Sequence, residues 1–200
     1  MTMMRMIGRL PLALLLGLAA AGDARAHPDI AITARLLFEV RGGRLAMVAE
    51  RFAFDAGHSR RLLDRFDADA DGRFDEDEAA DLRRSLAADL KPLGYFTELR
   101  HDGRPIALPA PAGFHATSEA GIVTVTLAFG LDPPLELGEG RTLELLLRDR
   151  DYTAAFRLAD ETPVVIRGDD GSCSHIIEAR PDLAYFGGLV VPQVVVLSCR

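Results

Sequence analysis

An acidic stretch, FDADADGRFDEDE at residues 66–78, carries the side chains of this chain that are best suited to chemistry. Carboxylates alternate around a single glycine, and the order matches the calcium-loop pattern of an EF-hand, D-x-[DN]-x-[DN]-G-x5-E. Calcium takes about six to eight oxygen ligands, which such a loop supplies as the chain wraps around the ion. The predicted ligands are the side chains of Asp67, Asp69, Asp71, Asp75 and Glu78 and the backbone carbonyl of Arg73.

Two alternatives to a calcium site deserve comparison. One is a solvated acidic turn, but Gly72 and Glu78 both stand at the positions that the pattern requires, and Phe74 is apolar where the loop should face the protein. The other is a different hard cation, because Mg²⁺ or Mn²⁺ can bind similar carboxylate sets. The chain has only one such loop, which favours a structural or ion-responsive clip over a paired calcium sensor.

A candidate second metal site, for a transition metal, lies at the start of the predicted mature chain. Cleavage after residue 26 would make His27 the first residue, whose free amine and imidazole can chelate copper or zinc, with Asp29 adding an oxygen. The alternative is a frayed terminus. No nucleophile elbow, zinc-protease motif or phosphate loop is present, so we expect a protein that is not an enzyme.

The first 26 residues have the layout of a secretory signal peptide. Arg5 and Arg9 precede the apolar run LPLALLLGLAAAG, and Ala24 and Ala26 fit a cleavage site. The run is shorter than the roughly 20 residues that span a bilayer, so a membrane anchor is the weaker alternative. We therefore expect a periplasmic protein.

Removal of the signal peptide makes the chain more acidic. The full chain has a formal net charge of −7, and its first 26 residues hold three arginines and one aspartate, so the mature chain carries −9. Such a charge disfavours nucleic acids and anionic membranes, which bind basic patches. Cations are the expected partners.

Cys173 and Cys199 are the two cysteines, and both remain after cleavage. In an oxidising compartment two cysteines most often form one disulfide, which here would join the C-terminal strand to a loop near residue 173. The alternative, a thiolate metal site that includes His175, lacks CxxC spacing.

Two helices are expected to position the acidic loop. Apolar residues recur at helical spacing in segments 57–66 and 77–93, and Pro92 should end the second helix. These segments predict an EF-hand helix–loop–helix inserted at about residues 57–91.

The rest of the chain predicts strands. Alternating apolar residues and glycine turns mark about nine of them, with hairpin turns at residues 41–43 and at Asp102–Gly103. We expect an α+β fold, consisting mainly of antiparallel sheets in a sandwich-like arrangement that forms one domain over residues 27–200. The strand segments are 29–40, 44–55, 95–108, 113–131, 141–149, 151–160, 162–168 and 192–199.

The order of several motifs resembles the bacterial domain-of-unknown-function family 1007. They are the HP at the cleavage site, ERFAFD, HSRRLLDRFDADADGRFDEDEAADL, LGYFTELRHDGRPI, RDRDYTAAF, GSCSHIIEARPD and PQVVVLSC. The resemblance implies the periplasmic component of an uncharacterised ABC-type transport system, often associated with nickel/cobalt or other transition-metal transport. Two positions depart from the family pattern: Asp29 replaces a histidine and Arg150 replaces a proline.

These observations lead to two hypotheses. The first is an exported calcium-binding protein that serves as an accessory component of nickel/cobalt-type metal-ion transport or homeostasis, with a metal ion and an inner-membrane transporter as partners. The alternative is a module that calcium only rigidifies, and which docks on a membrane transporter without binding a transported substrate. A hydrolase has no support in the sequence.

Overall fold

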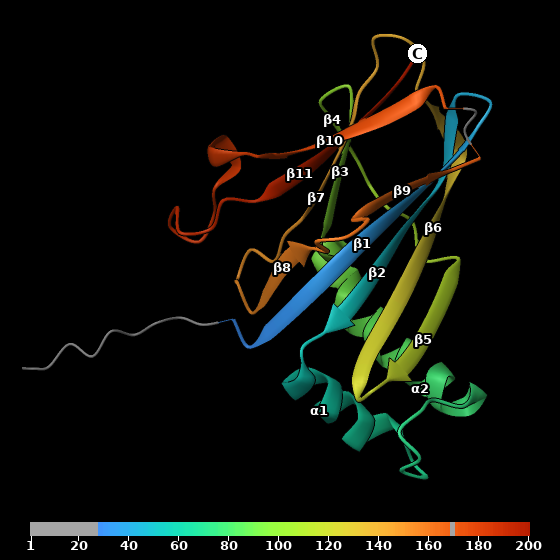
Figure 1. Ribbon diagram of the computed structural model, residues 1–200, viewed down its shortest axis with the longest axis vertical. Helices are drawn as coiled ribbons and strands as arrows, with labels where there is room; N and C mark the ends of the chain where they lie inside the picture. The colour runs from blue at the N-terminus through green and yellow to red at the C-terminus, as the bar shows by residue number, and fades with distance from the viewer. Residues whose placement is uncertain (1–27, 169–170) are drawn as a thin grey trace, which may run out of the picture.

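A computed structural model of the protein describes residues 28–168 and 171–200 (Figure 1). The predicted signal peptide and His27 lie outside the described residues. The strands of the described part are β1 Ile30–Arg41, β2 Arg44–Phe54, β3 Thr97–His101, β4 Arg104–Ile106, β5 Gly113–Glu119, β6 Ile122–Glu136, β7 Leu143–Leu147, β8 Ala154–Leu158, β9 Val164–Arg167, β10 Cys173–Ala179 and β11 Gln193–Cys199. The helices are α1 Ala56–Phe66 and α2 Glu76–Leu90, with 3-10 turns η1 Lys91–Phe96 and η2 Pro181–Leu183.

The strands form two sheets. Sheet A has the order β5-β6-β2-β1-β8, with β9 also paired to β1, and sheet B has the order β10-β11-β7-β3-β4. The α+β class with mainly antiparallel sheets, predicted from the alternation of apolar residues, is confirmed. One feature differs from the expectation: β8 and β9 run parallel to β1, along its first and second halves respectively. The parallel pairs arise because the chain leaves β7 in sheet B and crosses to the free edge of β1 in sheet A.

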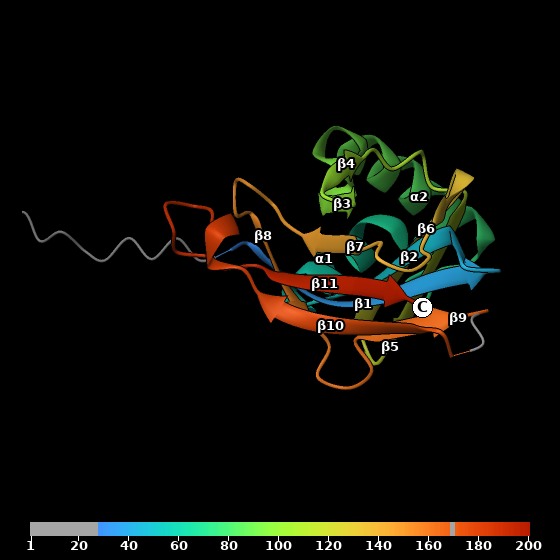
Figure 2. The same ribbon diagram turned by 90° about the horizontal axis from the view of Figure 1, so that it is seen from above.

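The predicted loop near residue 173 is wrong, because Cys173 begins a strand. Strand β10 pairs antiparallel with β11 over its whole length and forms the outer strand of sheet B. The connection between the two strands, residues 180–192, projects to one side of the molecule in both Figure 1 and Figure 2. The predicted disulfide is present and links Cys173 to Cys199 across the two strands.

The inner faces of the two sheets share one apolar core. Its largest fully buried side chains include Phe38, Phe52 and Phe129 from sheet A and Leu99, Leu145 and Leu197 from sheet B. Burial of such large apolar side chains is the main force that holds the sheets together.

The helix–loop–helix lies at one end of sheet A, at the bottom of Figure 1. Asp55 caps α1: one carboxylate oxygen accepts the N–H of His58 at 2.8 Å and the other accepts the N–H of Ala31 at 2.7 Å. Ser59 joins α1 to β6, because its buried hydroxyl oxygen accepts the N–H of Val123 at 3.0 Å. The scaffold therefore fixes the helix from which the acidic loop departs.

No helix of the described residues is long and apolar enough to cross a membrane.

Candidate metal centre

Three of the predicted ligands converge at the start of the acidic loop. Asp67 caps the C-terminus of α1, and carboxylate oxygens of Asp67, Asp69 and Asp71 lie within 4.8 Å of one another. Oxygens that bind one calcium ion at about 2.4 Å can be separated by at most twice that distance. The spacing of the three carboxylates therefore fits a shared calcium ion.

Backbone N–H groups hold these carboxylates in place. The two oxygens of Asp67 accept the N–H groups of Asp71 at 3.1 Å and Gly72 at 2.9 Å, and Asp71 accepts the N–H of Arg73 at 2.8 Å. Gly72 adopts a φ of 83°, a left-handed conformation that glycine takes without steric cost. The backbone of the loop thus curls around the three carboxylates.

Asp75 and Glu78 occupy a different position from the other three acids. They form a capping box at the start of α2, in which Asp75 accepts the N–H of Glu78 at 2.9 Å and Glu78 accepts the N–H of Asp75 at 3.0 Å. The second oxygen of Glu78 accepts the N–H of Ala68 at 2.6 Å, and the residue is buried. Glu78 therefore closes the loop by joining its beginning to α2.

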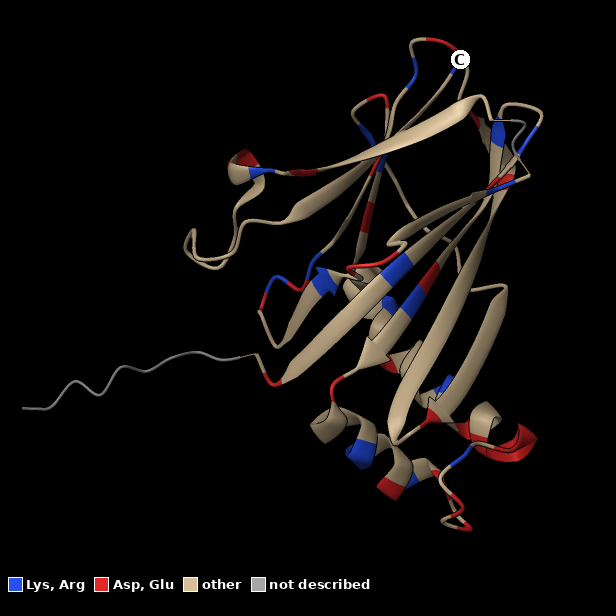
Figure 3. Cartoon of the chain, in the orientation of Figure 1, with Lys and Arg blue, Asp and Glu red and all other residues tan. Residues whose placement is uncertain are grey.

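The electrostatics of the loop reflect crowded negative charge. A hydrogen bond from the N–H of Asp71 lowers the pKa of Asp69, but burial and the charges of Asp71 and Glu78 raise it, and the net pKa lies above its ordinary value. Figure 3 shows acidic residues gathered along the loop and the first turn of α2. A bound cation would relieve this repulsion.

Phe74, from the middle of the loop, packs against the apolar core of the domain. Its half-buried ring fits the expectation that this position faces the protein. Because the loop is anchored on the domain's own core, the site can be rigid without a second loop of the same kind.

The candidate second site is only partly visible. His27 lies outside the described residues. Asp29 is exposed, and its backbone carbonyl accepts a hydrogen bond from Arg61 at 3.4 Å. The disulfide between Cys173 and Cys199 indicates an oxidising, exported environment and takes both cysteines out of any thiolate metal site.

Glu50 is a residue that the sequence analysis did not single out. It lies on β2 in the core between the sheets, has no exposed surface, and accepts a hydrogen bond from the hydroxyl of Thr97 on β3. Its other oxygen has no partner among the described residues. Burial raises the pKa of Glu50 to about 8, although the Thr97 hydrogen bond lowers it in part. Glu50 lies two residues from each of the buried residues Val48 and Phe52, and this alternation is the sequence signal that could have predicted its burial.

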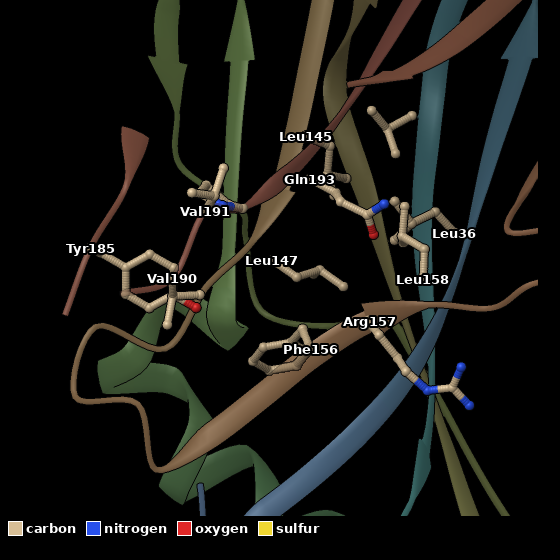
Figure 4. A pocket seen from close by; sticks show the side chains of 12 residues that line it. Leu36, Leu145, Leu147, Phe156, Arg157, Leu158, Tyr185, Val190, Val191 and Gln193 are labelled. Carbon is tan, nitrogen blue, oxygen red and sulfur yellow. The ribbon is translucent and has the colours of Figure 1, made fainter. Parts of the chain in front are cut away.

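A hollow of about 220 Å³ lies between the sheets (Figure 4). Leu36, Leu147 and Phe156 line it, and Tyr185 and Val190 from the projecting residues 180–192 cover one side. The guanidinium of Arg157 points away from the other labelled side chains. Because no carboxylate of the described residues lines this hollow, we do not assign a cation to it.

The model of a family described as "Protein of unknown function (DUF1007)" matches residues 12–186. The chain belongs to the DUF1007 family. This DUF1007 protein is also 29% identical, over 127 residues, to the "Uncharacterized 15.5 kDa protein in trpE 3'region" of Spirochaeta aurantia. The alignment covers 63% of the DUF1007 chain and 89% of the relative.

Proposed function

We propose that the protein is an exported calcium-binding protein with one EF-hand-type loop. The observation that carries the proposal is the convergence of Asp67, Asp69 and Asp71 within 4.8 Å of one another. The carboxylates of the loop, including Glu78, are ligands of the kind that Ca²⁺ prefers, and Mg²⁺ or Mn²⁺ are competitors for the same oxygens. When bound, the ion supplies positive charge that neutralises the loop and fastens α1 to α2.

Anchoring of the loop on the scaffold supports a structural role for the ion. Phe74 packs against the core, and Ser59 fastens α1 to β6. A sensor hand repacks against a partner hand when it opens, whereas this loop packs on a β scaffold. Calcium would therefore stabilise one conformation of the domain.

Thermal unfolding of residues 27–200, in calcium and in chelator, tests calcium binding. An ion that binds only the folded state stabilises it by about 2.7 kcal/mol at one hundred times the Kd. The informative variant is Asp69→Asn/Asp71→Asn, which keeps hydrogen-bond acceptors but removes two charges from the cluster. The control is Glu76→Gln/Asp77→Asn, which removes two charges from the first turn of α2 outside the ligand set.

The wild type and the control should unfold at a higher temperature in calcium, and the loop variant should not. In chelator, the loop variant should be as stable as the wild type or more stable, because its carboxylates no longer repel one another. Equal melting temperatures of the wild type with and without calcium would overturn the proposal.

We infer that the wider role is accessory to nickel/cobalt-type metal-ion transport or homeostasis, through the family resemblance. The second candidate, a calcium-rigidified module that docks on a transporter, is favoured by one observation: the projecting residues 180–192 expose Leu189 and Val191. Titration with nickel, cobalt and zinc separates the two. A transition-metal site that is lost in His27→Ala supports transport, and calcium binding alone supports docking.

A further inference from the structure

A second hollow, of about 290 Å³, lies between the helix–loop–helix and the adjacent end of sheet A. The C-terminal half of α2, η1 and the strands β1, β2 and β8 all contribute to its wall. Most of its lining is apolar and includes Ile30, Phe52, Phe54, Leu90, Leu93 and Phe96. Binding sites for small molecules are typically concave and mainly apolar, with a few polar groups that set specificity.

The charged groups in the lining of this pocket are all acidic. Asp89 from α2 and Asp149 and Asp151 from the β7–β8 loop line it, and no lysine or arginine of residues 28–168 and 171–200 does. Among the described residues, none of these three carboxylates forms an ion pair. Asp149 is 6% exposed, and within the described part of the chain its oxygens accept only backbone N–H groups, from Ala154 at 2.8 Å and Asp151 at 3.1 Å.

Basic residues close to these acids in sequence are directed elsewhere. Arg148 and Arg150, on either side of Asp149, both donate to the carboxylate of Glu98. His58 also lines the pocket, where burial and the charge of Arg61 lower its pKa although the charge of Asp55 raises it, so the charged form of the ring is disfavoured. Arg61 contacts the ring of His58 but does not line the pocket. The pocket is therefore apolar and negative.

We propose that this pocket binds a small organic ammonium ion that carries an apolar chain. The apolar wall would take the chain out of water, and the carboxylates would attract the positive charge. The rings of Phe52, Phe54 and Phe96 also line the pocket, and aromatic faces attract organic ammonium groups. An apolar carboxylate would be repelled by the three acids, and an inorganic cation would gain nothing from the apolar wall.

The proposal goes beyond calcium binding and does not require it. The pocket includes none of the predicted calcium ligands, although α2 links the two regions because it has Glu78 in its first turn and ends at Leu90. Ligand binding should therefore be measured in calcium and again in chelator. If the ligand binds in both media but calcium does not change the melting temperature, the calcium site is refuted. The proposal of a ligand-binding pocket then still stands.

Three probes with six-carbon chains separate the contribution of the ligand's positive charge to affinity from that of its apolar chain. They are hexyltrimethylammonium, hexanol and hexanoate. The chain contains no tryptophan, so Leu93→Trp places the one tryptophan of the variant at the pocket, where Leu93 is 48% exposed. Hexyltrimethylammonium should change its fluorescence saturably, and calorimetry on the wild-type protein should give the same affinity. Hexanol and hexanoate should bind at least about tenfold more weakly, since neither gains from the acids.

Charge variants complete the test. Asp89→Asn/Asp151→Asn should weaken hexyltrimethylammonium binding by about tenfold or more. The matched control Asp64→Asn/Glu119→Gln removes the same charge from exposed residues outside the pocket and should bind as the wild type does. Absence of saturable binding, equal binding of hexanol, or an unchanged affinity of the pocket variant would overturn the proposal.

Discussion

Glu50 illustrates how one buried residue can shape the behaviour of the protein. Its carboxyl group lies between the two sheets with one hydrogen bond, from Thr97, and one oxygen without a partner among the described residues. A charged carboxylate in such surroundings is costly, so the folded protein retains a proton on Glu50 up to about pH 8. Stability should consequently depend on pH through this residue.

The Glu50→Gln variant tests this dependence. The folded state keeps the proton that the unfolded chain releases above about pH 4.5, so Glu50 should cost stability as the pH rises from there to about 8. The slope is about 1.4 kcal/mol per pH unit, and it vanishes above pH 8, where both states are ionised. The difference in unfolding free energy between Glu50→Gln and wild type should grow in favour of the variant over this range. Parallel curves for the two proteins would refute the assignment.

Ser59 offers a second test at the same scale. Its hydroxyl donates to the carbonyl of Phe54 at 3.3 Å and accepts the N–H of Val123 at 3.0 Å. Ser59→Ala should lower the free energy of unfolding by about 1–3 kcal/mol, because it leaves a buried N–H without a partner. Ser118→Ala is the matched control: the buried hydroxyl of Ser118 has no partner among the described residues, so its loss should be nearly neutral. Equal effects in denaturant titrations would contradict the role of Ser59.

At the scale of elements, the two ends of the molecule are stabilised by different means. At one end, Asp55 and Asp75 cap the two helices. Ser59 and Phe74 attach the helix–loop–helix to the β scaffold. At the other end, the disulfide links β10 to β11 at the outer edge of sheet B. The ring of Tyr152, in the β7–β8 loop, contacts Tyr185 and Phe186 of the projecting residues 180–192. Changes at the disulfide should therefore leave the acidic loop intact.

The double variant Cys173→Ser/Cys199→Ser tests this independence. The disulfide closes a loop of sequence separation 26, and its loss should lower the free energy of unfolding by about 3 kcal/mol. The rise in melting temperature caused by calcium should persist, and proteolytic cleavage should increase first in residues 173–199. Loss of the calcium effect in this variant would show that the two ends are coupled.

Sequence patterns predict some of these elements better than others. The two helices could be predicted because apolar residues recur at helical spacing in both segments and Pro92 stands near the end of the second. Strand β10 could not, since CSHIIEA has little alternation and follows the turn-forming residues GDDGS. Glu50 stands on the inner face of β2, but a charged residue there is ordinarily interpreted as exposed.

At the scale of the whole molecule, the alternation of apolar residues predicts two packed sheets but not how their strands are paired. The parallel pairing of β8 and β9 with β1 depends on where the chain crosses between the sheets, which alternation does not encode. The spacing of the acidic stretch predicts a ligand set, whereas the pocket beside it gathers residues from distant segments. Asp89 and Asp151 come together only through the fold.

The central proposal is that one acidic loop, attached to a β scaffold, binds one calcium ion. The number of calcium ions bound per chain tests this proposal most directly. Calorimetric titration of the mature protein should show one calcium site, which is lost in Asp69→Asn/Asp71→Asn and retained in Glu76→Gln/Asp77→Asn. Absence of calcium binding by the wild type, or a site that survives in the loop variant, would contradict the account.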